Sequence, residues 1–408
     1  MPHDRVEASL RREIEKLAAE GRRKGAEAVI AGFVPASGKH GPRFLIAGEG
    51  DKPFLRMNAN NYLGLSLEAQ IIAAEDEGVR RFGTGPGAVR FISGTWAPHI
   101  ELEHRLAAFH GCASAMVFSS AYAAMMGTLP PLAMADTAVI SDELNHSCII
   151  NAIRLARPAQ RHVYAHLDLK ALEARLDEAS GACRRAIIVT DGVFSMRGDH
   201  APLAEIAALA RRFDPAFPEN VLVMIDDSHG IGALGATGRG TQERTGAEAD
   251  ILIGTLGKAF GVNGGYVAAS ETVTAFLRET SPFYVYSNPI APGEAAAAAR
   301  AVAFVGSAAG QRLLRHLNEM AARFRGGLKA LGFETIGGDH PIVPLMVRDT
   351  QRTAALVKHL RARGILATGL NFPVVPRGDE EIRFQICADH TEADIDEALA
   401  ALRDFPAA

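Results

Sequence analysis

A lysine flanked by glycines is the first feature of this sequence that could do chemistry. Lys258 lies in the segment 254–261, directly after the apolar run 251–253. A buried lysine has a lowered pKa and can form a Schiff base with an aldehyde. The segment lacks the GxxxxGK[ST] spacing of a phosphate-binding loop. By itself, however, it also fits a lysine that grips a phosphate or lies on the surface.

Two adjacent carboxylates follow another apolar run. Asp226 and Asp227 come directly after residues 221–225. Carboxylates at the end of a buried strand are costly unless a cation compensates them. One of the two could therefore face a buried cation, such as a protonated pyridine nitrogen. The alternative is a helix cap next to a carboxylate that faces solvent.

Three more apolar runs precede residues that a planar, phosphorylated ligand could use. Small residues after the run 116–118 open a helical stretch, and the N-terminus of a helix is a ready anion site. His146 follows the run 138–140 and could stack on a ring, although a lone histidine is more often structural. Ser195 follows the run 187–189 and offers a hydroxyl group.

These features gain meaning from their combination. An anion site, a stacking histidine, a hydroxyl, a carboxylate pair and a lysine occur in this order on successive apolar runs. Pyridoxal 5′-phosphate (PLP) needs all of them, because its phosphate, ring, pyridine nitrogen and aldehyde each require a partner. The sequence therefore predicts a PLP site.

The elements that would position these residues alternate between strands and helices. Short, continuous apolar runs suit strands that are buried on both faces of a parallel sheet. The stretch 168–176 is a typical intervening helix, because Asp168 can cap it and its leucines fall on one face. Ligands of such α/β sheets gather at the carboxyl ends of the strands. We therefore expect all the candidate residues at that edge.

The alternation of short strands and helices ends at about residue 295. We expect a long helical stretch to residue 331 with a break near 306–310, strands over 342–347 and 381–387, and a helix over 353–363. A last helix begins at Thr391, which forms a capping-box pattern with Asp394. We predict three parts: an N-terminal helix and arm (1–57), a large PLP-binding domain (58–296) and a small α+β domain (297–408).

Composition and sequence patterns argue against several other classes of protein. The formal net charge is −4 over 408 residues, which predicts no nucleic-acid partner. No signal peptide or stretch of about 18 apolar residues is evident, so we expect no membrane association. The four cysteines show no CxxC spacing and no nearby histidine cluster. We read them as reduced thiols of a cytoplasmic protein without a metal site.

Six motifs of the chain resemble those of the α-oxoamine synthases, PLP-dependent enzymes of fold type I that join an amino acid to an acyl-CoA. The motifs are NNYLGL (60–65), RFISGT (90–95), LNHS (144–147), DGVFSM (191–196), DDSH (226–229) and TLGK (255–258). The similarity extends from about residue 58 to the end of the chain. It implies a large domain with a mostly parallel seven-stranded sheet and a smaller C-terminal α+β domain.

The resemblance implies a role for each matching residue. Lys258 would carry the cofactor and later move the α-proton of the substrate. Asp226 would pair with the pyridine nitrogen. His229 would bond to the phenolic oxygen of the cofactor, and His146 would stack on its ring.

The phosphate and substrate contacts follow in the same way. Ala121 and Tyr122 would offer backbone N–H groups to the phosphate, and Thr255 a hydroxyl. Ser287 and Asn288 would reach that phosphate from the other subunit, so a homodimer is implied.

The amino-acid substrate would meet three further residues. Ser195 would lie near it, and Asn60 and Arg383 would receive its carboxylate. A guanidinium fork suits a carboxylate, although Arg383 could also be an exposed arginine of a strand.

Within the family the sequence is most similar to the glycine C-acetyltransferases, which implies glycine and acetyl-CoA as substrates. The alternative is a relative that uses a different amino acid or a longer acyl-CoA. Pro86, Trp96 and Met125 depart from the family pattern in segments that border the substrate. A PLP-binding protein without catalysis and an ordinary aminotransferase are less compatible with the retained Lys258, His146 and Arg383 and with the TLGK motif.

Overall fold

The computed structural model describes residues 3–20, 22–23, 26–372 and 374–406. The chain divides into two compact units. The first consists of Met1–Ala59, Met320–Ile336 and Ile342–Ala408, and the second of Asn60–Glu319 and Gly337–Pro341.

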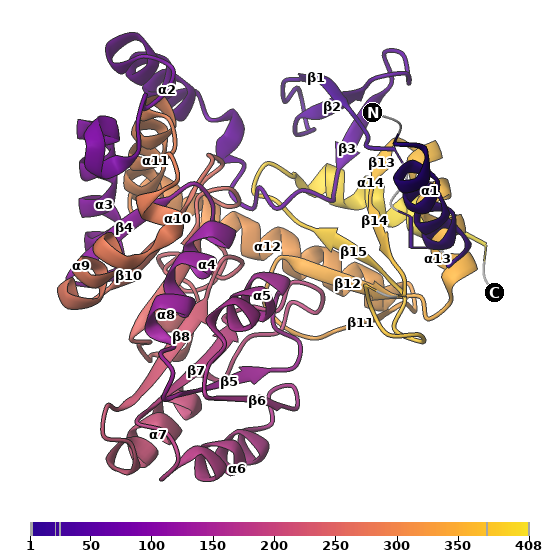
Figure 1. Ribbon diagram of the computed structural model, residues 1–408. Coiled ribbons are helices and arrows are strands. Elements are labelled where there is room, and N and C mark those ends of the chain that lie inside the picture. Colours follow the sequence, from indigo (N-terminus) through magenta and orange to yellow (C-terminus); the bar gives the residue numbers. More distant parts are fainter. Residues whose placement is uncertain (1–2, 21, 24–25, 373, 407–408) are drawn as a thin grey trace. The chain divides into compact units, whose positions relative to one another are not determined.

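A seven-stranded sheet forms the centre of the second unit (Figure 1). Its strands are β4 (Ser114–Phe118), β5 (Thr137–Asp142), β6 (Gln160–Tyr164), β7 (Arg185–Asp191), β8 (Val221–Asp226), β9 (Ile251–Thr255) and β10 (Gly265–Ala269). They lie in the order β4-β10-β9-β8-β7-β5-β6. The strands from β9 to β6 in this order pair in parallel, whereas β10 is antiparallel to both of its neighbours.

This sheet confirms the predicted fold class. The apolar runs at 116–118, 138–140, 187–189, 221–225 and 251–253 lie in β4, β5, β7, β8 and β9. The two remaining strands have weaker signals. β6 is an edge strand whose exposed and half-buried positions alternate, and β10 is a short run of glycine, alanine, valine and tyrosine.

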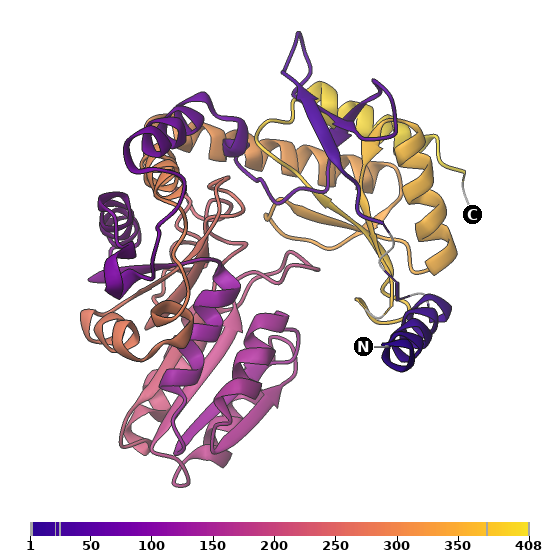
Figure 2. The same ribbon diagram turned by 45° about the horizontal axis from the view of Figure 1, so that its top comes forward.

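Helices connect and cover the strands. They are α2 (Ala69–Phe82), α3 (Ala97–His110), α4 (Ala121–Leu132), α5 (Ser147–Ala156), α6 (Leu169–Ala179), α7 (Leu203–Phe213), α8 (Thr241–Thr245), α9 (Glu271–Thr280), α10 (Pro282–Val285) and α11 (Pro292–Val305). Asp168 caps α6 as predicted, because its carboxylate accepts bonds from Lys170 N and Ala171 N. Helices α4 and α5 lie side by side over one face of the sheet (Figure 2).

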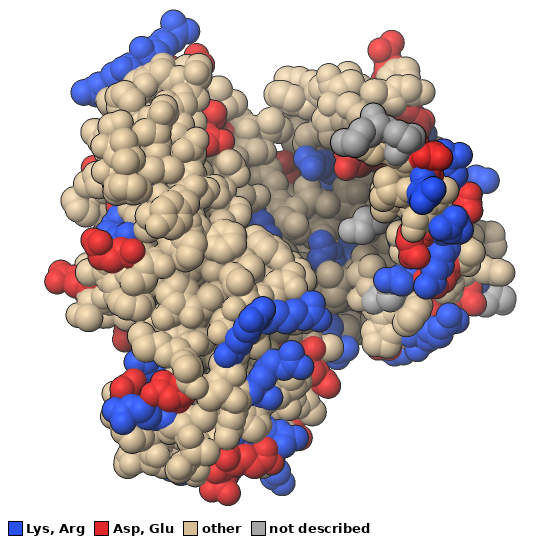
Figure 3. All heavy atoms as spheres, in the orientation of Figure 1, with Lys and Arg blue, Asp and Glu red and all other residues tan. Residues whose placement is uncertain are grey.

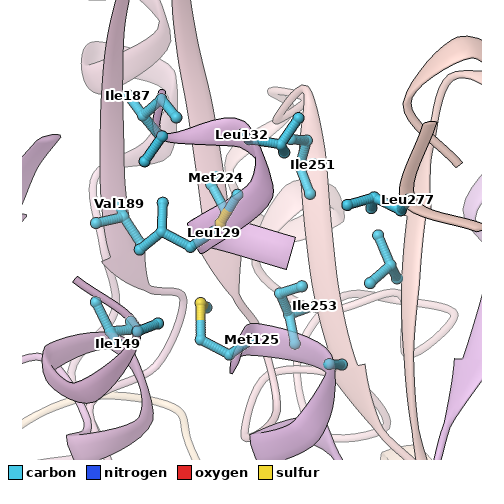
Figure 4. Close-up of a cluster of buried hydrophobic side chains, with 14 of the residues drawn as sticks. Met125, Leu129, Leu132, Ile149, Ile187, Val189, Met224, Ile251, Ile253 and Leu277 are labelled. Carbon is cyan, nitrogen blue, oxygen red and sulfur yellow. The ribbon is translucent and has the colours of Figure 1, made fainter. Parts of the chain in front are cut away.

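The buried core between α4, α5 and the sheet contains Met125, one of the residues that depart from the family pattern. Met125 of α4 is fully buried and packs in one cluster with Ile149, Val189 and Met224 (Figure 4). The side chain of Met125 therefore faces the core, while its helix reaches the cavity described below at Ala121 and Tyr122. Because α4 lies on the sheet, a position one turn into the helix points to the strands.

The first unit contains two small sheets. One has the order β1-β2-β3-β13, with β1 (Ile30–Val34), β2 (Arg43–Ile46), β3 (Pro53–Arg56) and β13 (Ile365–Leu366). The other has the order β11-β12-β15-β14, with β11 (Glu334–Thr335), β12 (Ile342–Met346), β15 (Glu381–Gln385) and β14 (Thr368–Leu370). Its helices are α1 (Asp4–Ala19), the C-terminal part of α12 (Ala308–Ala330), α13 (Thr350–Ala362) and α14 (Glu392–Arg403).

The unit boundaries differ from the predicted boundaries at residues 57 and 296. The N-terminal segment contains strands and joins the C-terminal part, because β3 pairs in parallel with β13. The side chain of Asp394 strengthens this connection, since it accepts bonds from Gly41 N at 2.9 Å and Arg43 Nη2 at 2.7 Å. The second boundary falls within α12, which runs without interruption across residue 319.

Charged side chains of both signs lie interspersed on the face shown in Figure 3. No described helix combines the length and hydropathy that a bilayer crossing requires.

Packing around Met125 generates a stability prediction. Met125→Ala should lower the free energy of unfolding by about 2–5 kcal/mol, because it leaves a cavity in a closely packed core. Met134→Ala is the matched control, since Met134 is 45% exposed, and it should change stability by less than about 0.5 kcal/mol. Denaturant titration of both variants measures the difference. Equal stabilities would contradict the burial of Met125.

Candidate active site

A cavity of about 240 Å³ lies at the edge of the large sheet where the parallel strands end. It is lined by Ser120, Ala121, Tyr122, His146, Cys148, Asp191, Ser195, Asp226, Ser228, His229, Thr255 and Lys258. The residues that the sequence assigned to the lysine, the carboxylate, the stacking ring, the anion site and the hydroxyl therefore share one cavity.

Strand register explains why distant residues meet here. Parallel pairing of β7 with β8 places Asp191 opposite Asp226, at the last position of each strand. β9 is the next strand along the sheet, and its last residue is Thr255. Lys258 follows Thr255 in the turn after the strand. Because the carboxyl ends of parallel strands share one edge, the chemistry gathers at that edge.

The first turn of α4 forms the wall of the cavity nearest β10. Ser120 caps the helix by accepting a bond from Ala123 N at 3.0 Å. The N–H groups of Ala121 and Tyr122 belong to the first turn of a helix, where backbone donors have no partner within the helix. β10 approaches this turn closely, since a Cβ atom at Gly265 would lie 2.1 Å from Ala121 N. Backbone donors at the start of a helix favour an anion, and the residues that carry them line the cavity.

The two adjacent carboxylates have separate environments. Asp226 lines the cavity, and its oxygens accept bonds from Ser228 N at 3.1 Å and Cys148 Sγ at 3.3 Å. Asp227 does not line the cavity. It accepts bonds from Thr241 N at 2.7 Å and Thr241 Oγ1 at 2.6 Å. Burial raises the pKa of Asp227 to about 7, while these two hydrogen bonds act in the opposite direction. Only Asp226 is therefore placed to face a cation in the cavity.

Glycines leave room for the Asp227 carboxylate. A Cβ atom at Gly192, Gly230 or Gly240 would lie 2.0–2.2 Å from one of its oxygens. The carboxylate thus sits in a space that exists because three neighbouring residues lack side chains, and it connects the ends of β7 and β8 to the start of α8.

His146 is the N-cap of α5, and four contacts fix its orientation, one of which joins its Nδ1 to Cys148 Sγ at 3.0 Å. Its backbone N–H donates to Asp191 Oδ2 at 2.9 Å, and its Nδ1 accepts from Cys148 N at 3.3 Å. Its ring lies 6.4 Å from the ring of Tyr122, at an interplanar angle of 80°. Burial lowers the pKa of His146, and Lys258 lowers it further, against the opposing effect of Asp226. A neutral ring is therefore favoured beside the cavity.

Four lining residues had no assigned role in the sequence analysis: Ser120, Cys148, Asp191 and Ser228. Burial raises the pKa of Asp191, and the nearby Asp226 raises it further. Burial and Asp226 also raise the pKa of the Cys148 thiol, which therefore remains protonated and can donate to Asp226. Asp191 follows an apolar run just as Asp226 does, and this signal could have identified it.

His229 is held from two sides. Its Nδ1 lies 2.7 Å from Tyr62 Oη, and its backbone carbonyl accepts a bond from His340 Nε2 at 2.8 Å. The rings of Tyr62 and His340 meet edge to face, with centroids 5.4 Å apart. In the sequence Tyr62 was recognised only as part of the NNYLGL motif. The structure shows that Tyr62 positions His229.

Several predicted residues do not line this cavity. Ser287 and Asn288 lie between α10 and α11, and Asn60 lies at the start of the second unit. Arg383 belongs to the first unit, where it occupies the middle of β15. With the Gln385 amide turned so that its oxygen faces Arg383, this oxygen accepts a bond from Arg383 Nε at 2.7 Å.

Pro86 and Trp96 are also absent from the lining of the cavity. Trp96 Nε1 donates to the carbonyl of Pro86 at 3.1 Å, and the indole ring packs edge to face against Phe82. This pair fixes the loop before α3.

A family model for class I and II aminotransferases matches residues 52–402. The chain belongs to this family. An 8-amino-7-oxononanoate synthase from Geobacter metallireducens is 41% identical over 97% of both chains. A 2-amino-3-ketobutyrate coenzyme A ligase from Escherichia coli is 43% identical over 84% of this chain and 85% of the relative. Both names belong to α-oxoamine synthases, so the predicted resemblance is confirmed.

Solved structures of serine palmitoyltransferases (SPT) have the same fold. The Sphingomonas wittichii enzyme superposes with a TM-score of 0.86 at 27% identity, over 98% of this chain and 96% of that one. A high-resolution structure of SPT with PLP has a TM-score of 0.84 at 28% identity, with the same coverage.

The space around Asp227 generates a prediction. Gly230→Ala should lower the free energy of unfolding by about 1–3 kcal/mol, because the added methyl group would collide with the Asp227 carboxylate. Gly326→Ala on α12 is the control, since a Cβ atom there meets nothing within 4 Å. It should stabilise the helix by up to about 1 kcal/mol. Thermal melts compare the two variants, and an unaffected Gly230→Ala protein would refute the tight packing.

Proposed function

We propose that this protein is a PLP-dependent acyltransferase. It would join an amino acid to an acyl-CoA and release CoA with a β-keto amino acid or an aminoketone. One observation carries the proposal: Lys258, Asp226, His146 and the first turn of α4 line a single cavity at the strand ends.

The donor set of the cavity fits PLP. Its anion site suits the phosphate, its buried carboxylate suits a protonated pyridine nitrogen, and its lysine suits the aldehyde. A structure of SPT, which has the same fold, contains PLP. When bound, PLP supplies an electron sink that stabilises negative charge at the α-carbon of an attached amino acid.

Each residue of the cavity would then have a separate role toward the cofactor and the substrate. Lys258 would hold the aldehyde and, once displaced by the substrate amine, take the α-proton. Asp226 would keep the pyridine nitrogen protonated, and the Ser228 N–H and Cys148 thiol hold this carboxylate in place. His229 would bond to the phenolic oxygen of the cofactor, and the contact of its Nδ1 with Tyr62 Oη at 2.7 Å orients its ring.

The phosphate would be bound by backbone N–H groups of Ala121 and Tyr122 and by the hydroxyl of Thr255. Ser287 and Asn288 do not line the cavity of their own chain. We propose that they complete the phosphate site of a second copy in a homodimer, as the family resemblance implies.

Arg383 and Asn60 would receive the carboxylate of the amino acid, and Ser195 would lie beside the substrate. Gln385 supports this role, because its amide oxygen orients the Arg383 fork. Arginine is suited to the task, since it offers paired donors in a fixed plane.

Glycine and acetyl-CoA are the substrates that we propose first. 2-Amino-3-ketobutyrate, which the name of one relative contains, is the β-keto amino acid that glycine and an acetyl group form. The alternative is another amino acid or a longer acyl donor, because 8-amino-7-oxononanoate synthases are similarly related. We expect the reaction to take place in the cytoplasm.

Spectroscopy with substrates tests the proposal. The purified protein with PLP should be yellow, glycine should shift its absorption band, and acetyl-CoA should then release free thiol in proportion to glycine. A band that responds only to another amino acid would favour the alternative substrates. A protein that shows no visible band with PLP would contradict the proposal.

Lys258→Ala should remove the visible band and reduce turnover by roughly 10²–10⁴-fold, because both the covalent attachment and the proton transfer are lost. Absorbance and a thiol-release assay measure the two effects. A yellow variant with normal turnover would show that another residue carries the cofactor.

Arg383→Ala should raise the KM for the amino acid by roughly 10–100-fold while PLP remains bound, because a charged hydrogen-bond pair is lost. Arg363→Ala provides the control, since Arg363 pairs with Asp404 on the surface of the same unit. An equal KM for both variants would place the substrate carboxylate elsewhere.

A further inference from the structure

His166 lies between two carboxylates, beside the cavity but outside its lining. Its Nδ1 is 3.1 Å from Asp142 Oδ1, and its Nε2 is 3.2 Å from Asp199 Oδ2. Its side chain is 14% exposed, and its ring packs edge to face on Phe194 with centroids 4.4 Å apart. Both ring nitrogens thus face acceptors.

Asp142 organises the turn that leads to His146. It is the last residue of β5, its Oδ1 accepts from Leu144 N at 2.8 Å, and its Oδ2 accepts from Leu167 N at 3.0 Å. The carboxylate therefore connects the end of β5 to the loop after β6. His146 follows two residues after Leu144 and lines the cavity.

Asp199 organises the loop that carries Ser195. Its backbone carbonyl accepts from Phe194 N at 2.9 Å, and its Oδ2 accepts from Arg197 Nε at 2.9 Å. These bonds close a tight loop over residues 194–199, and Ser195 in this loop lines the cavity. His166 therefore contacts the anchors of two walls of the cavity.

Only the imidazolium form can donate to both anchors, because a neutral imidazole carries one N–H group. The other charged groups close to His166 are Arg197, which shares Asp199, and Glu143, whose Oε1 accepts from His166 N at 2.9 Å. Burial disfavours the cation, but the bonds to Asp142 and Asp199 outweigh it and raise the pKa of His166 to about 9.

We propose that His166 is a positioning residue that, as an imidazolium, holds the turn before His146 and the Ser195 loop together and releases the loop when it loses its proton. We call the two contacts of His166 with Asp142 and Asp199 the clamp. The clamp itself does not depend on the proposed function. The consequence for catalysis does, because it assumes the roles given to His146 and Ser195.

The direction of the pH dependence follows from the raised pKa. A histidine whose pKa is higher in the folded state contributes its stabilisation fully below the unfolded value of about 6.5. This contribution declines as the pH rises and is lost above about 9. The Ser195 loop should therefore be held at neutral pH and released in alkaline solution.

A direct test is an NMR titration of the histidine ring protons in the full-length protein, with His166 assigned by its absence in His166→Gln. We expect His166 to titrate near pH 9. His162→Gln is the matched control, because His162 lies on β6 and faces Glu178 at 3.4 Å instead of the loop. A titration of His166 near pH 6.5 would overturn the clamp.

Trypsin provides a second test, because Arg197 lies in the loop and its side chain is 40% exposed. Cleavage after Arg197, normalised to a free peptide of residues 192–201, should rise roughly tenfold between pH 7 and pH 10. In His166→Gln it should be high at both pH values, and in His162→Gln it should follow the wild type. A normalised rate without pH dependence in the wild type would overturn the proposal.

Asp199→Asn keeps the experiment decisive if His166→Gln fails to fold. It removes one of the two carboxylates, so the titration of His166 should move to lower pH and loop cleavage should increase. An unchanged titration would refute the contact.

Kinetics at pH 7 separate the clamp from the proposed function. His166→Gln should bind PLP normally and lose roughly tenfold or more in kcat/KM for glycine, whereas His162→Gln should retain activity. Normal kinetics with a released loop would show that the loop does not position Ser195 for catalysis. The titration and the cleavage assay require no turnover, so the clamp can succeed or fail whatever the substrate proves to be.

Discussion

Burial of several carboxylates at one sheet edge is the constraint on which the site depends. Asp191 and Asp226 end neighbouring parallel strands, and Asp227 follows directly in a space enclosed by glycines. Burial raises the pKa of Asp191 and of Asp227. Negative charge in such an environment requires donors and cations at fixed positions. Thr241, Ser228, Cys148 and the backbone of His146 supply the donors, and Lys258 lies in the same cavity to supply positive charge.

Much of this arrangement could be predicted from the sequence. Lys258, Asp226, His146 and Ser195 each follow an apolar run, and a parallel sheet brings such positions to one edge. The fold class followed from the same runs, because strands buried on both faces are continuously apolar.

Other features could be recognised only from the three-dimensional arrangement of the strands and helices. The Cys148–Asp226 contact joins residues on different elements, and no local pattern indicates it. Asp227 and Asp226 are adjacent in sequence, and their roles are distinguished by which of them lines the cavity, by the bonds from Thr241 to Asp227 and by the glycines around Asp227. The sequence did not determine which way Met125 points, because an apolar residue at the start of a helix can face either the strands or the cavity. The N-terminal strands were missed because β1 to β3 are only four or five residues long and β1 contains a glycine, so none forms a long apolar run.

The position of β10 has a consequence for the order of events during biosynthesis. β4, at residues 114–118, lies at the edge of this sheet, and among the described residues its one neighbouring strand is β10, at residues 265–269. The anion site at the start of α4 follows β4 directly and is closed by Gly265. In the sequence β10 comes after every other strand of this sheet, so a nascent chain cannot complete this turn until β10 has left the ribosome. Pairing of such distant segments is slow, so the wall of the cavity at α4 should be completed late among the elements of this sheet.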